Sequence, residues 1–583
     1  MWTIDVYLQP KTINTMKKIF IPALLLISVF AFGQNSKVLY KINYKQITNG
    51  QESKNDFDIK YYDGVVYLSK PDAKVQTFVN LNKRKIITTI SVNDSLYKKE
   101  TLFDSLPKYK VIDKAEKILN FQCKAVSYSY FSNTIEVWYT EESPAKGSPY
   151  SKFLPNSNAL VLKVVVNGNR IIKATSIDKI KIFNKPKYLP PLAQKVDKPR
   201  FDELTINSRF TKLNVFKDEQ IYFDGKFTKS DDKDLQLNKV YHFSKGSVVL
   251  KKIKLPEIAK TCGYIIAELT AKSNGDAYDR TGSVFIIPQD GLTTMLDAYI
   301  YGLDTLPVFT DRRNMNYQGF YRTENYEPSI ELMRFFTSFG VGHFNHKKIH
   351  NYKWLEKAVY KQEITKLIPN NNDEIIVGVF IGNYDKGGHK ISLDLNFYPN
   401  DEEVDSSIKY IEPIFLTVNT MEMEGQNYGR LFKTDTLHAN FEITDSISDL
   451  ELLFTTTGHG GWGTGDEFIQ KLNQVYLDDK KIFNIVPWRT DCATYRMSNP
   501  ASGNFSVGLS SSDLSRSNWC PGTLTPPYVI PLKNIGIGKH SIKVVIDQGD
   551  DVKGGSCAWS VSGVLVGRIQ HPSSFYPFSH PHG

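Results

Sequence analysis

Cysteine is scarce in this chain, with only 5 among 583 residues. So few cysteines do not make a disulfide scaffold, and the absence of any Cys-X-X-Cys pair argues against a structural zinc site. We expect Cys492 and Cys520, which share one turn-rich segment, to form a disulfide after export, and closing that loop would stabilise the fold by roughly 3–4 kcal/mol. Cys123, Cys262 and Cys557 would then be free or buried.

The chain also lacks any block of five or six like charges. Its formal charge of +10 is spread over 72 basic and 62 acidic residues, so nucleic-acid binding is not expected. Beyond the N-terminus no apolar run reaches the length of a membrane span, about 18 residues or more. Aromatic residues are abundant, with 34 Phe, 32 Tyr and 7 Trp. Most of them should fill β-sheet cores, although aromatic faces also suit sugar rings.

The N-terminus carries an export signal. Two lysines after Met16 precede an apolar run over 19–32, which small Gly33 and polar Gln34 follow. This is the charged region, apolar region and cleavage point of a signal peptide. We therefore expect residues 1–35 to be an upstream extension and a signal peptide starting at Met16. Removal near Gly33/Gln34 predicts a secreted protein, extracellular or periplasmic.

Short runs of alternating β-branched and aromatic residues recur along the chain and predict an all-β fold. Residues 36–182 are interpreted as an N-terminal antiparallel β domain of unknown role. The proline- and lysine-rich segment 183–204 is the best linker candidate. Two further sets of about eight short strands, over 205–400 and 401–583, predict two sandwiches in tandem; the second set ends in a His/Pro-rich tail. One helix is expected between Trp354 and Ile368.

Polar residues that could carry chemistry gather in three loops. The first, SNGDAYDRTGSVFIIP, holds Asp276, Tyr278, Asp279 and Arg280 just before a predicted strand. Taken alone, an aspartate followed by an arginine is common and favours a solvated turn over a functional site.

The second loop, TTTGHGGWGTGDEFIQK, frames His459, Trp462, Asp466 and Glu467 with five glycines. Such glycines let a backbone approach a ligand closely, although they also occur in ordinary β-turns. The third loop, SSSDLSRSNWCPG, adds arginine and tryptophan next to a predicted disulfide cysteine. Together the loops supply what amide hydrolysis requires: one carboxylate to take a proton from water, a second to orient water or amide, and arginines to keep the carboxylates charged.

From about residue 205 to 567 the chain resembles the peptide-N-glycosidase F family of bacterial glycoamidases. The motifs that carry the resemblance are AYDRTGSVFII, GDEFIQK and SRSNWCPG, the last being similar to the family's Arg-x-x-Trp-Cys-Pro-Gly. The resemblance implies two adjacent eight-stranded jelly rolls with the active site at their interface. It also implies that Cys492 and Cys520 stand in place of a family disulfide.

The resemblance further implies hydrolysis of the amide bond between asparagine and the innermost GlcNAc of N-linked glycans, with no metal or other cofactor. Asp279 would be the base that activates water, while Glu467 and Arg516 position that water and stabilise the developing charge. Arg280 would orient Asp279 or the sugar. The partners would be N-glycosylated peptides and proteins, and we expect a monomer. The other substrate-binding residues would be Tyr278, His459, Trp519, Gly382 and Tyr384.

The chain departs from the family pattern at several positions. A third family carboxylate belongs where this chain has Gly382, and Tyr384 replaces a tryptophan nearby. We hypothesise that Gly382 widens the pocket around the proximal GlcNAc and admits substituents such as core α1,3-linked fucose. Tyr278 stands where the family has tryptophan, and Gly465 and Ile469 replace two cysteines.

Two other interpretations stay open. The missing third acid allows a non-catalytic N-glycan-binding protein on the same fold, which would bind a glycoprotein without converting asparagine to aspartate. A metal-dependent oxidase or glycosidase would instead use histidines, and undiminished activity in EDTA would count against it. The histidines with ligand-like spacing or crowding are His343, His346, His350, His571, His580 and His582.

Overall fold

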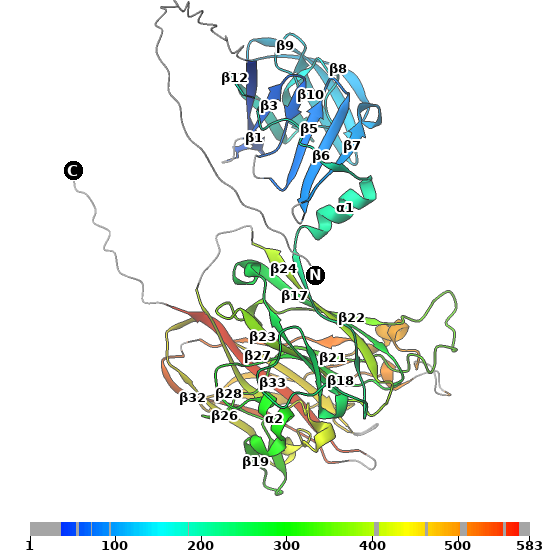
Figure 1. Ribbon diagram of the computed structural model, residues 1–583, viewed down its shortest axis with the longest axis vertical. Helices are drawn as coiled ribbons and strands as arrows, with labels where there is room; N and C mark the ends of the chain where they lie inside the picture. The colour runs from blue at the N-terminus through cyan, green and yellow to red at the C-terminus, as the bar shows by residue number, and fades with distance from the viewer. Residues whose placement is uncertain are drawn as a thin grey trace, which may run out of the picture. The chain divides into compact units, whose positions relative to one another are not determined.

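The computed structural model describes residues 37–570 except 54–56, 71–72, 93–94, 185, 401–406, 461–464, 502–505, 507–509, 534 and 552–554. The expected signal peptide, Trp462 and the histidines of the tail lie outside these residues. The chain divides into two compact units between Ile206 and Asn207. Strands dominate both units, which confirms the all-β expectation (Figure 1). Among the described residues, no helix combines the length and apolar character of a membrane span.

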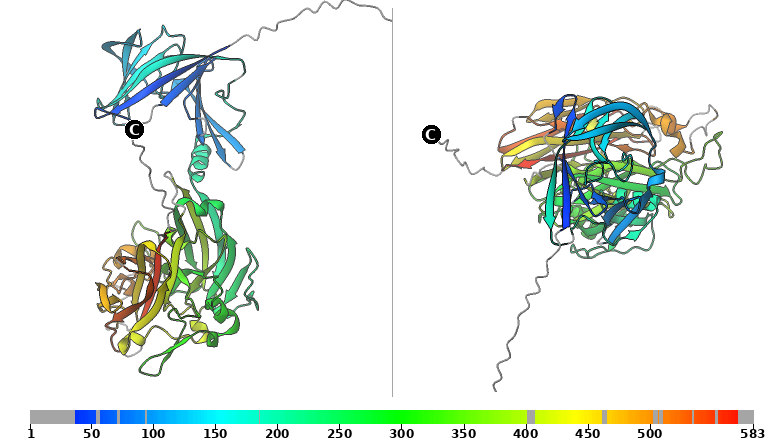
Figure 2. Two further views of the ribbon diagram at one scale, coloured as in Figure 1. Left: turned by 90° about the vertical axis from the view of Figure 1, so that its left-hand side faces the viewer. Right: turned by 90° about the horizontal axis from the view of Figure 1, so that it is seen from above.

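The first unit is one twisted and curved sheet of 13 strands (Figures 1 and 2). Every pairing in it is antiparallel except that of β13 with β7. The antiparallel N-terminal domain expected from the sequence is therefore present. In order across the sheet the strands are β13 (Gln194–Lys195), β7 (Ser95–Leu102), β6 (Lys85–Val92), β5 (Val75–Asn80), β4 (Val65–Tyr67), β3 (Phe57–Tyr62), β1 (Lys37–Thr48), β12 (Arg170–Ile182), β11 (Leu160–Val166), β10 (Asn133–Thr140), β9 (Phe121–Tyr130) and β8 (Tyr109–Ile118), with β2 (Gln51–Glu52) paired to β1.

The segment expected as a linker is partly folded onto this sheet. After β13, helix α1 (Lys198–Asn207) begins with a proline in its first turn, where a missing N–H costs nothing. Its buried Phe201 and Leu204 pack in one cluster with Ile90 of β6. Asp202 lies 3.2 Å from Lys99 of β7. The end of the proline-rich segment therefore belongs to the core of the first unit.

The second unit begins with a four-stranded and a six-stranded sheet. One shared core, which contains Leu269, Leu393, Val284 and Val379, lies between them. The first sheet has the order β14 (Thr211–Ile221), β24 (His389–Pro399), β17 (Cys262–Ser273) and β22 (Ala358–Glu363). The second has the order β15 (Val240–Phe243), β16 (Val248–Lys254), β23 (Glu374–Ile381), β18 (Thr281–Ile287), β21 (Ile330–Phe336) and β30 (Leu524–Thr525).

Two further four-stranded sheets pack around a core that includes Leu452, Phe454, Ile542 and Trp559. These eight strands match the predicted second set. The first sheet has the order β25 (Lys409–Leu416), β33 (Ala558–Ile569), β27 (Ile447–His459) and β31 (Tyr528–Pro531), and the second β26 (Leu437–Ile443), β32 (Gly538–Ile546), β28 (Asn473–Leu477) and β29 (Lys480–Ile485).

Shorter elements connect the sheets. Outside the four sheets the second unit has helix α2 (Met295–Tyr301) and a hairpin of β19 (Val308–Thr310) and β20 (Asn316–Gln318). The described 3-10 helices are η1 (Phe103–Ser105), η2 (Ser244–Gly246), η3 (Glu257–Lys260), η4 (Leu303–Thr305), η5 (Thr365–Leu367), η6 (Glu422–Glu424), η7 (Leu431–Lys433), η8 (Cys492–Ser498) and η9 (Ser511–Asp513).

The prediction of a helix between Trp354 and Ile368 is wrong. The segment contains β22, in which Ala358 and Tyr360 are buried while Val359 is exposed. This alternation places one face of the strand against the core, and β22 pairs antiparallel with β17. The apolar residues further along the segment misled the prediction, because they belong to the turn that follows the strand.

Strand β18 is buried on both faces. Val284 and Ile286 point into the core between the first two sheets, while Phe285 and Ile287 belong to a second buried cluster with α2. A strand held from both sides is rigid because close-packed side chains leave no room for it to move. The loop that carries Asp279, the predicted catalytic residue, leads directly into this strand.

A buried ion pair joins β21 to the second sandwich. Arg334, which is 1% exposed, lies 2.7 Å from Glu331 and also donates to Thr457 of β27 and to the carbonyl of Ser560 in β33. Ser562 of β33 donates to Glu331 at 2.6 Å. These charge-assisted bonds hold the six-stranded sheet and the second sandwich together.

Candidate functional site

Asp279 lies at the entrance of β18, in a loop that hydrogen bonds hold in place. Buried Asp276 accepts a bond from the backbone N–H of Tyr278 at 3.0 Å. The hydroxyl of Thr337 donates to the carbonyl of Tyr278 and accepts from the N–H of Arg280 at 2.8 Å. The loop is thus tied to β18 and to the end of β21, which limits the positions that the Asp279 carboxylate can reach.

Glu467 lies in the glycine-rich loop after β27. Its N–H donates to the carbonyl of Gly460 at 3.2 Å, and its own carbonyl accepts from the N–H of Ser517 at 3.0 Å. The preceding residue, Asp466, is 1% exposed and accepts from the indole of Trp559 at 2.8 Å. Asp466 therefore anchors the turn that presents Glu467.

Arg516 brings the two acids together. Its Nη1 lies 3.2 Å from Oδ2 of Asp279 and 2.7 Å from Oε1 of Glu467, while Nη2 donates to the carbonyl of Ser511. The Arg516 side chain is buried, and its backbone exchanges two hydrogen bonds with Arg489. The three residues predicted as catalytic, which come from three loops, meet at one guanidinium.

Burial raises the pKa of both carboxyls. It raises the pKa of Glu467 to about 7, against the opposing effect of Arg516, and nearby Asp279 adds to the rise. Burial also raises the pKa of Asp279, although Arg516 and Arg280 act in the other direction. Both side chains remain 19% exposed, so water can reach them. For Glu467 the expectation that an arginine keeps the carboxylate charged is wrong near neutral pH, because Arg516 does not offset the desolvation of that carboxylate.

The predicted disulfide is present. Cys492 in η8 and Cys520 are bonded, with Cα atoms 5.2 Å apart. Asp491, next to Cys492, pairs with Arg489 at 2.7 Å. The disulfide and this ion pair brace both segments around Arg516, which a positioned guanidinium requires.

Trp519 does not offer a free face to a sugar. It is 4% exposed, the Arg516 guanidinium lies 4.3 Å from its ring centroid, and Phe336 stacks on it at 4.3 Å. His459 packs against the same rings at 5.5 Å and 5.8 Å. Burial lowers the pKa of His459 to about 3, so its ring is neutral, and Nε2 lies 2.8 Å from the hydroxyl of Thr457. The prediction that Trp519 lines the sugar site is therefore wrong, since the buried Trp519 ring packs against the Arg516 guanidinium.

Arg280 binds Asp276 and not Asp279. Its Nε donates to Oδ2 of Asp276 at 2.8 Å. The guanidinium lies 4.9 Å from the ring centroid of Tyr278 and 5.8 Å from that of Tyr384. These tyrosines are 59% and 55% exposed, and Phe339 stacks on the ring of Tyr278 at 6.3 Å. The role expected for Arg280 is to orient either Asp279 or the sugar. Because it binds Asp276, this geometry favours the role toward the sugar.

Gly382 does not leave an empty space. A Cβ at this position would lie 2.6 Å from Oε1 of Glu422, which comes from η6. The hypothesis that Gly382 widens the pocket is therefore corrected, since a carboxylate from another segment occupies that room. No sequence motif marks Glu422; the only available signal was the unexplained glycine.

The histidines with ligand-like spacing do not gather. His343, His346 and His350 are all exposed, and the ring of His343 lies 2.7 Å from the carbonyl of Gly275. Within the described ranges, the one cluster of three potential ligand atoms consists of Asp491 and the disulfide cysteines Cys492 and Cys520. Nothing in the described part of the chain therefore gives these histidines a common ligand.

Three family models match the chain. The N-terminal domain of peptide-N-glycosidase F matches residues 212–397, its C-terminal domain matches 427–566, and the N-terminal domain of N-glycanase peptide matches 33–206. Two solved structures of PNGF-II, in space groups C2 and P21, are 39% identical to this chain. They cover 94% and 91% of this chain and 100% of their own, with TM-scores of 0.77 and 0.79.

This chain belongs to the peptide-N-glycosidase F family. PNGase F from Flavobacterium meningosepticum, described as a glycosylasparaginase, is 13% identical over 62% of this chain and 96% of its own, with a TM-score of 0.41. No curated protein matches the chain.

Membership of the peptide-N-glycosidase F family accounts for the two sandwiches and their jelly-roll architecture. The family acts on N-glycosylated proteins. In the described residues of this family member the first sandwich has ten strands rather than the predicted eight, because β30 from the second half and the short edge strand β15 extend one sheet.

Proposed function

We propose that the chain hydrolyses the amide bond between asparagine and the innermost GlcNAc of N-linked glycans. The glycan leaves as a glycosylamine and the asparagine becomes an aspartate. The observation that carries this proposal is the single Arg516 guanidinium bound to both Asp279 and Glu467. Family membership supplies the substrate class.

In the proposed reaction Asp279 takes a proton from water as the water oxygen bonds to the amide carbon. Negative charge then develops on the amide oxygen. Arg516 lies next to both carboxyls, and its positive charge stabilises the negative charge on that oxygen. The C–N bond breaks, and the departing nitrogen accepts a proton from Glu467. A carboxyl whose pKa is about 7 can hold that proton near neutral pH and release it in the reaction.

We also propose that the protein is secreted and acts as a monomer. The charged and apolar segments at the N-terminus support export. N-terminal sequencing of protein recovered from the culture medium would place the first residue at Gln34 or a neighbour. Light scattering would test the oligomeric state.

The test of the proposed activity is to incubate a denatured N-glycoprotein with the protein and analyse the peptides by mass spectrometry. Aspartate at the former glycan site supports the proposal. A single GlcNAc left on asparagine would identify an endoglycosidase, and glycan binding without any conversion would identify a binding protein on this fold.

A further inference from the structure

The space beside Gly382 is filled by Glu422. A Cβ at Gly382 would meet Oε1 of Glu422 at 2.6 Å, a distance that real Cβ atoms essentially never show, and Phe380 at 3.2 Å, which is a tight contact. The backbone at Gly382 does not have the positive φ that would itself require glycine. The missing side chain therefore serves to make room for the Glu422 carboxylate.

Glu422 lies close to the loop that carries Asp279. The N–H of Gly382 donates to the carbonyl of Thr281 at 3.1 Å, two residues after Asp279. Burial raises the pKa of both Asp279 and Glu422, and the charge of Arg280 opposes that rise at both acids. The site thus has a third carboxylate, on the Arg280 side, in addition to the two bound by Arg516.

One oxygen of this carboxylate is held and the other is free. Oε2 of Glu422 accepts from the hydroxyl of Tyr428 at 2.6 Å and from Nδ2 of Asn419 at 3.2 Å. No described residue donates to Oε1, and no described lysine, arginine or histidine forms an ion pair with Glu422. Burial raises the pKa of Glu422. A partly buried acceptor without a donor is costly unless water or a ligand supplies one.

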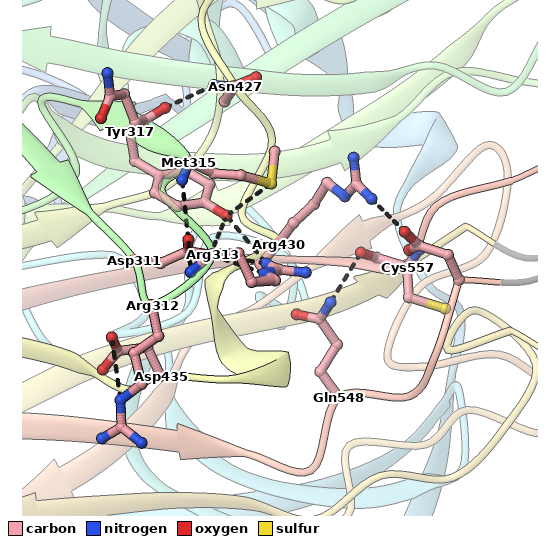
Figure 3. Close-up of polar contacts among 12 residues, drawn as sticks. Asp311, Arg312, Arg313, Met315, Tyr317, Asn427, Arg430, Asp435, Gln548 and Cys557 are labelled. Atoms are coloured by element: carbon pink, nitrogen blue, oxygen red, sulfur yellow. Dashed lines mark hydrogen bonds and ion pairs between the residues drawn. The ribbon is translucent and has the colours of Figure 1, made fainter.

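Contacts on both sides fix the segment that carries Tyr428 (Figure 3). Asn427 donates to the carbonyl of Asn316 at 2.6 Å, and Arg313 donates to the carbonyl of Arg430. The N–H of Trp559 donates to the carbonyl of Gly429 at 2.8 Å. Tyr428 is therefore held in a defined position, and through it so is Glu422.

We propose that Glu422 is a substrate-binding residue whose Oε1 accepts a hydrogen bond from a hydroxyl or acetamido N–H of the sugar attached to asparagine. An ionised carboxylate accepts and does not donate, so its ligand must be a donor. The partly exposed rings of Tyr278 and Tyr384, which both contact the Arg280 guanidinium, suit a sugar ring. This inference rests on the proposed function for the identity of the sugar.

The first test is the binding of N,N′-diacetylchitobiose by calorimetry. It compares wild type with Glu422→Gln and with a matched control, Glu424→Gln, which makes the same change at an exposed residue of the same turn. In the first variant, Asn419 and Tyr428 keep the amide oxygen on their side, so the NH2 group faces the sugar. We expect Glu422→Gln to weaken binding about tenfold, the loss of one bond to a charged acceptor, and the control to bind as wild type.

The second variant is Gly382→Ala, which pushes Oε1 away without changing its charge, with exposed Gly536→Ala as its control because nothing lies within 4 Å of a Cβ there. We expect weaker chitobiose binding for Gly382→Ala alone. With a glycopeptide substrate, KM should rise for both site variants while kcat changes less, because the bond is made in the ground state as well. Melting curves confirm that each variant is folded.

Absence of chitobiose binding by folded wild type, or a Kd for Glu422→Gln within about twofold of the wild-type value, overturns the inference. The proposed function is decided separately, by conversion of asparagine to aspartate. Binding that depends on Glu422 without such conversion would reject the amidase and leave the sugar-binding role of Glu422 standing.

Discussion

Nη1 of Arg516 lies 3.2 Å from Oδ2 of Asp279, although 237 positions separate the two residues in the chain. The same nitrogen lies 2.7 Å from Oε1 of Glu467. Two carboxylates and one guanidinium leave a net negative charge in a partly buried place. Burial of the two carboxyls is the main physical cause of their raised pKa values, and the charge of Asp279 adds to the rise for Glu467.

Replacement of Asp279 by asparagine should remove the base. Asparagine has nearly the same shape and can still accept a bond from Arg516, but it cannot take a proton from water. We expect kcat/KM on a fluorescent glycopeptide to fall by about 10²–10⁴-fold or more with an unchanged circular dichroism spectrum. Asp304→Asn, at an exposed position, is the matched control. Turnover by Asp279→Asn close to that of wild type would reject Asp279 as the base.

Glu467 should make stability depend on pH. Its pKa is 4.5 without the folded environment and about 7 within it, so the folded chain binds more protons between these values. The free energy of unfolding contributed by Glu467 therefore falls as the pH rises from about 4.5 to 7. In the Glu467→Gln variant this pH-dependent loss in the free energy of unfolding is absent.

The measurement is the melting temperature of wild type and Glu467→Gln from pH 5 to pH 8. The difference between variant and wild type should grow in favour of the variant across this range. Glu424→Gln should follow wild type at each pH. A constant difference between Glu467→Gln and wild type would mean that burial does not raise the pKa of Glu467. Activity of this variant should be low at every pH, because glutamine cannot donate the proton.

The Cys492–Cys520 disulfide should stabilise the protein and brace Arg516. The double variant Cys492→Ser/Cys520→Ser should lose roughly 3–4 kcal/mol in the free energy of unfolding, measured in urea. Reductant should lower the stability of wild type but not that of the variant. Cys262→Ser, which removes a free thiol, is the control. If the double variant equals the control in stability, the bond does not contribute to it.

The buried pair of Arg334 and Glu331 should be needed for the two sandwiches to stay together. Arg334→Met leaves Glu331 charged and uncompensated, which costs about 3–5 kcal/mol. Adding Glu331→Gln removes the stranded charge and should restore part of that loss. The denaturation midpoint in urea measures both effects. A double variant less stable than Arg334→Met would contradict this account.

Much of the architecture could be predicted because strand patterns are local. The runs around Val284, Val379 and Leu393 alternate or are continuously apolar, and each is a strand in the structure. The predicted residues Asp279, Glu467 and Arg516 do meet, although their spacing alone did not require it. The helix expected near Trp354 failed because apolar spacing over a short stretch does not distinguish a strand and its turn from a helix.

The sequence by itself determined the all-β fold, the two sets of strands and the three loops with their acids and arginine, since these depend on residue periodicity and on motifs contiguous in the chain. Only the tertiary structure decided how side chains from distant loops share space. It joined Asp279 and Glu467 through Arg516 and placed Glu422 in the room left by Gly382. The reason is physical: a contact across 40 or more positions depends on how whole sheets pack, and no local pattern encodes that packing.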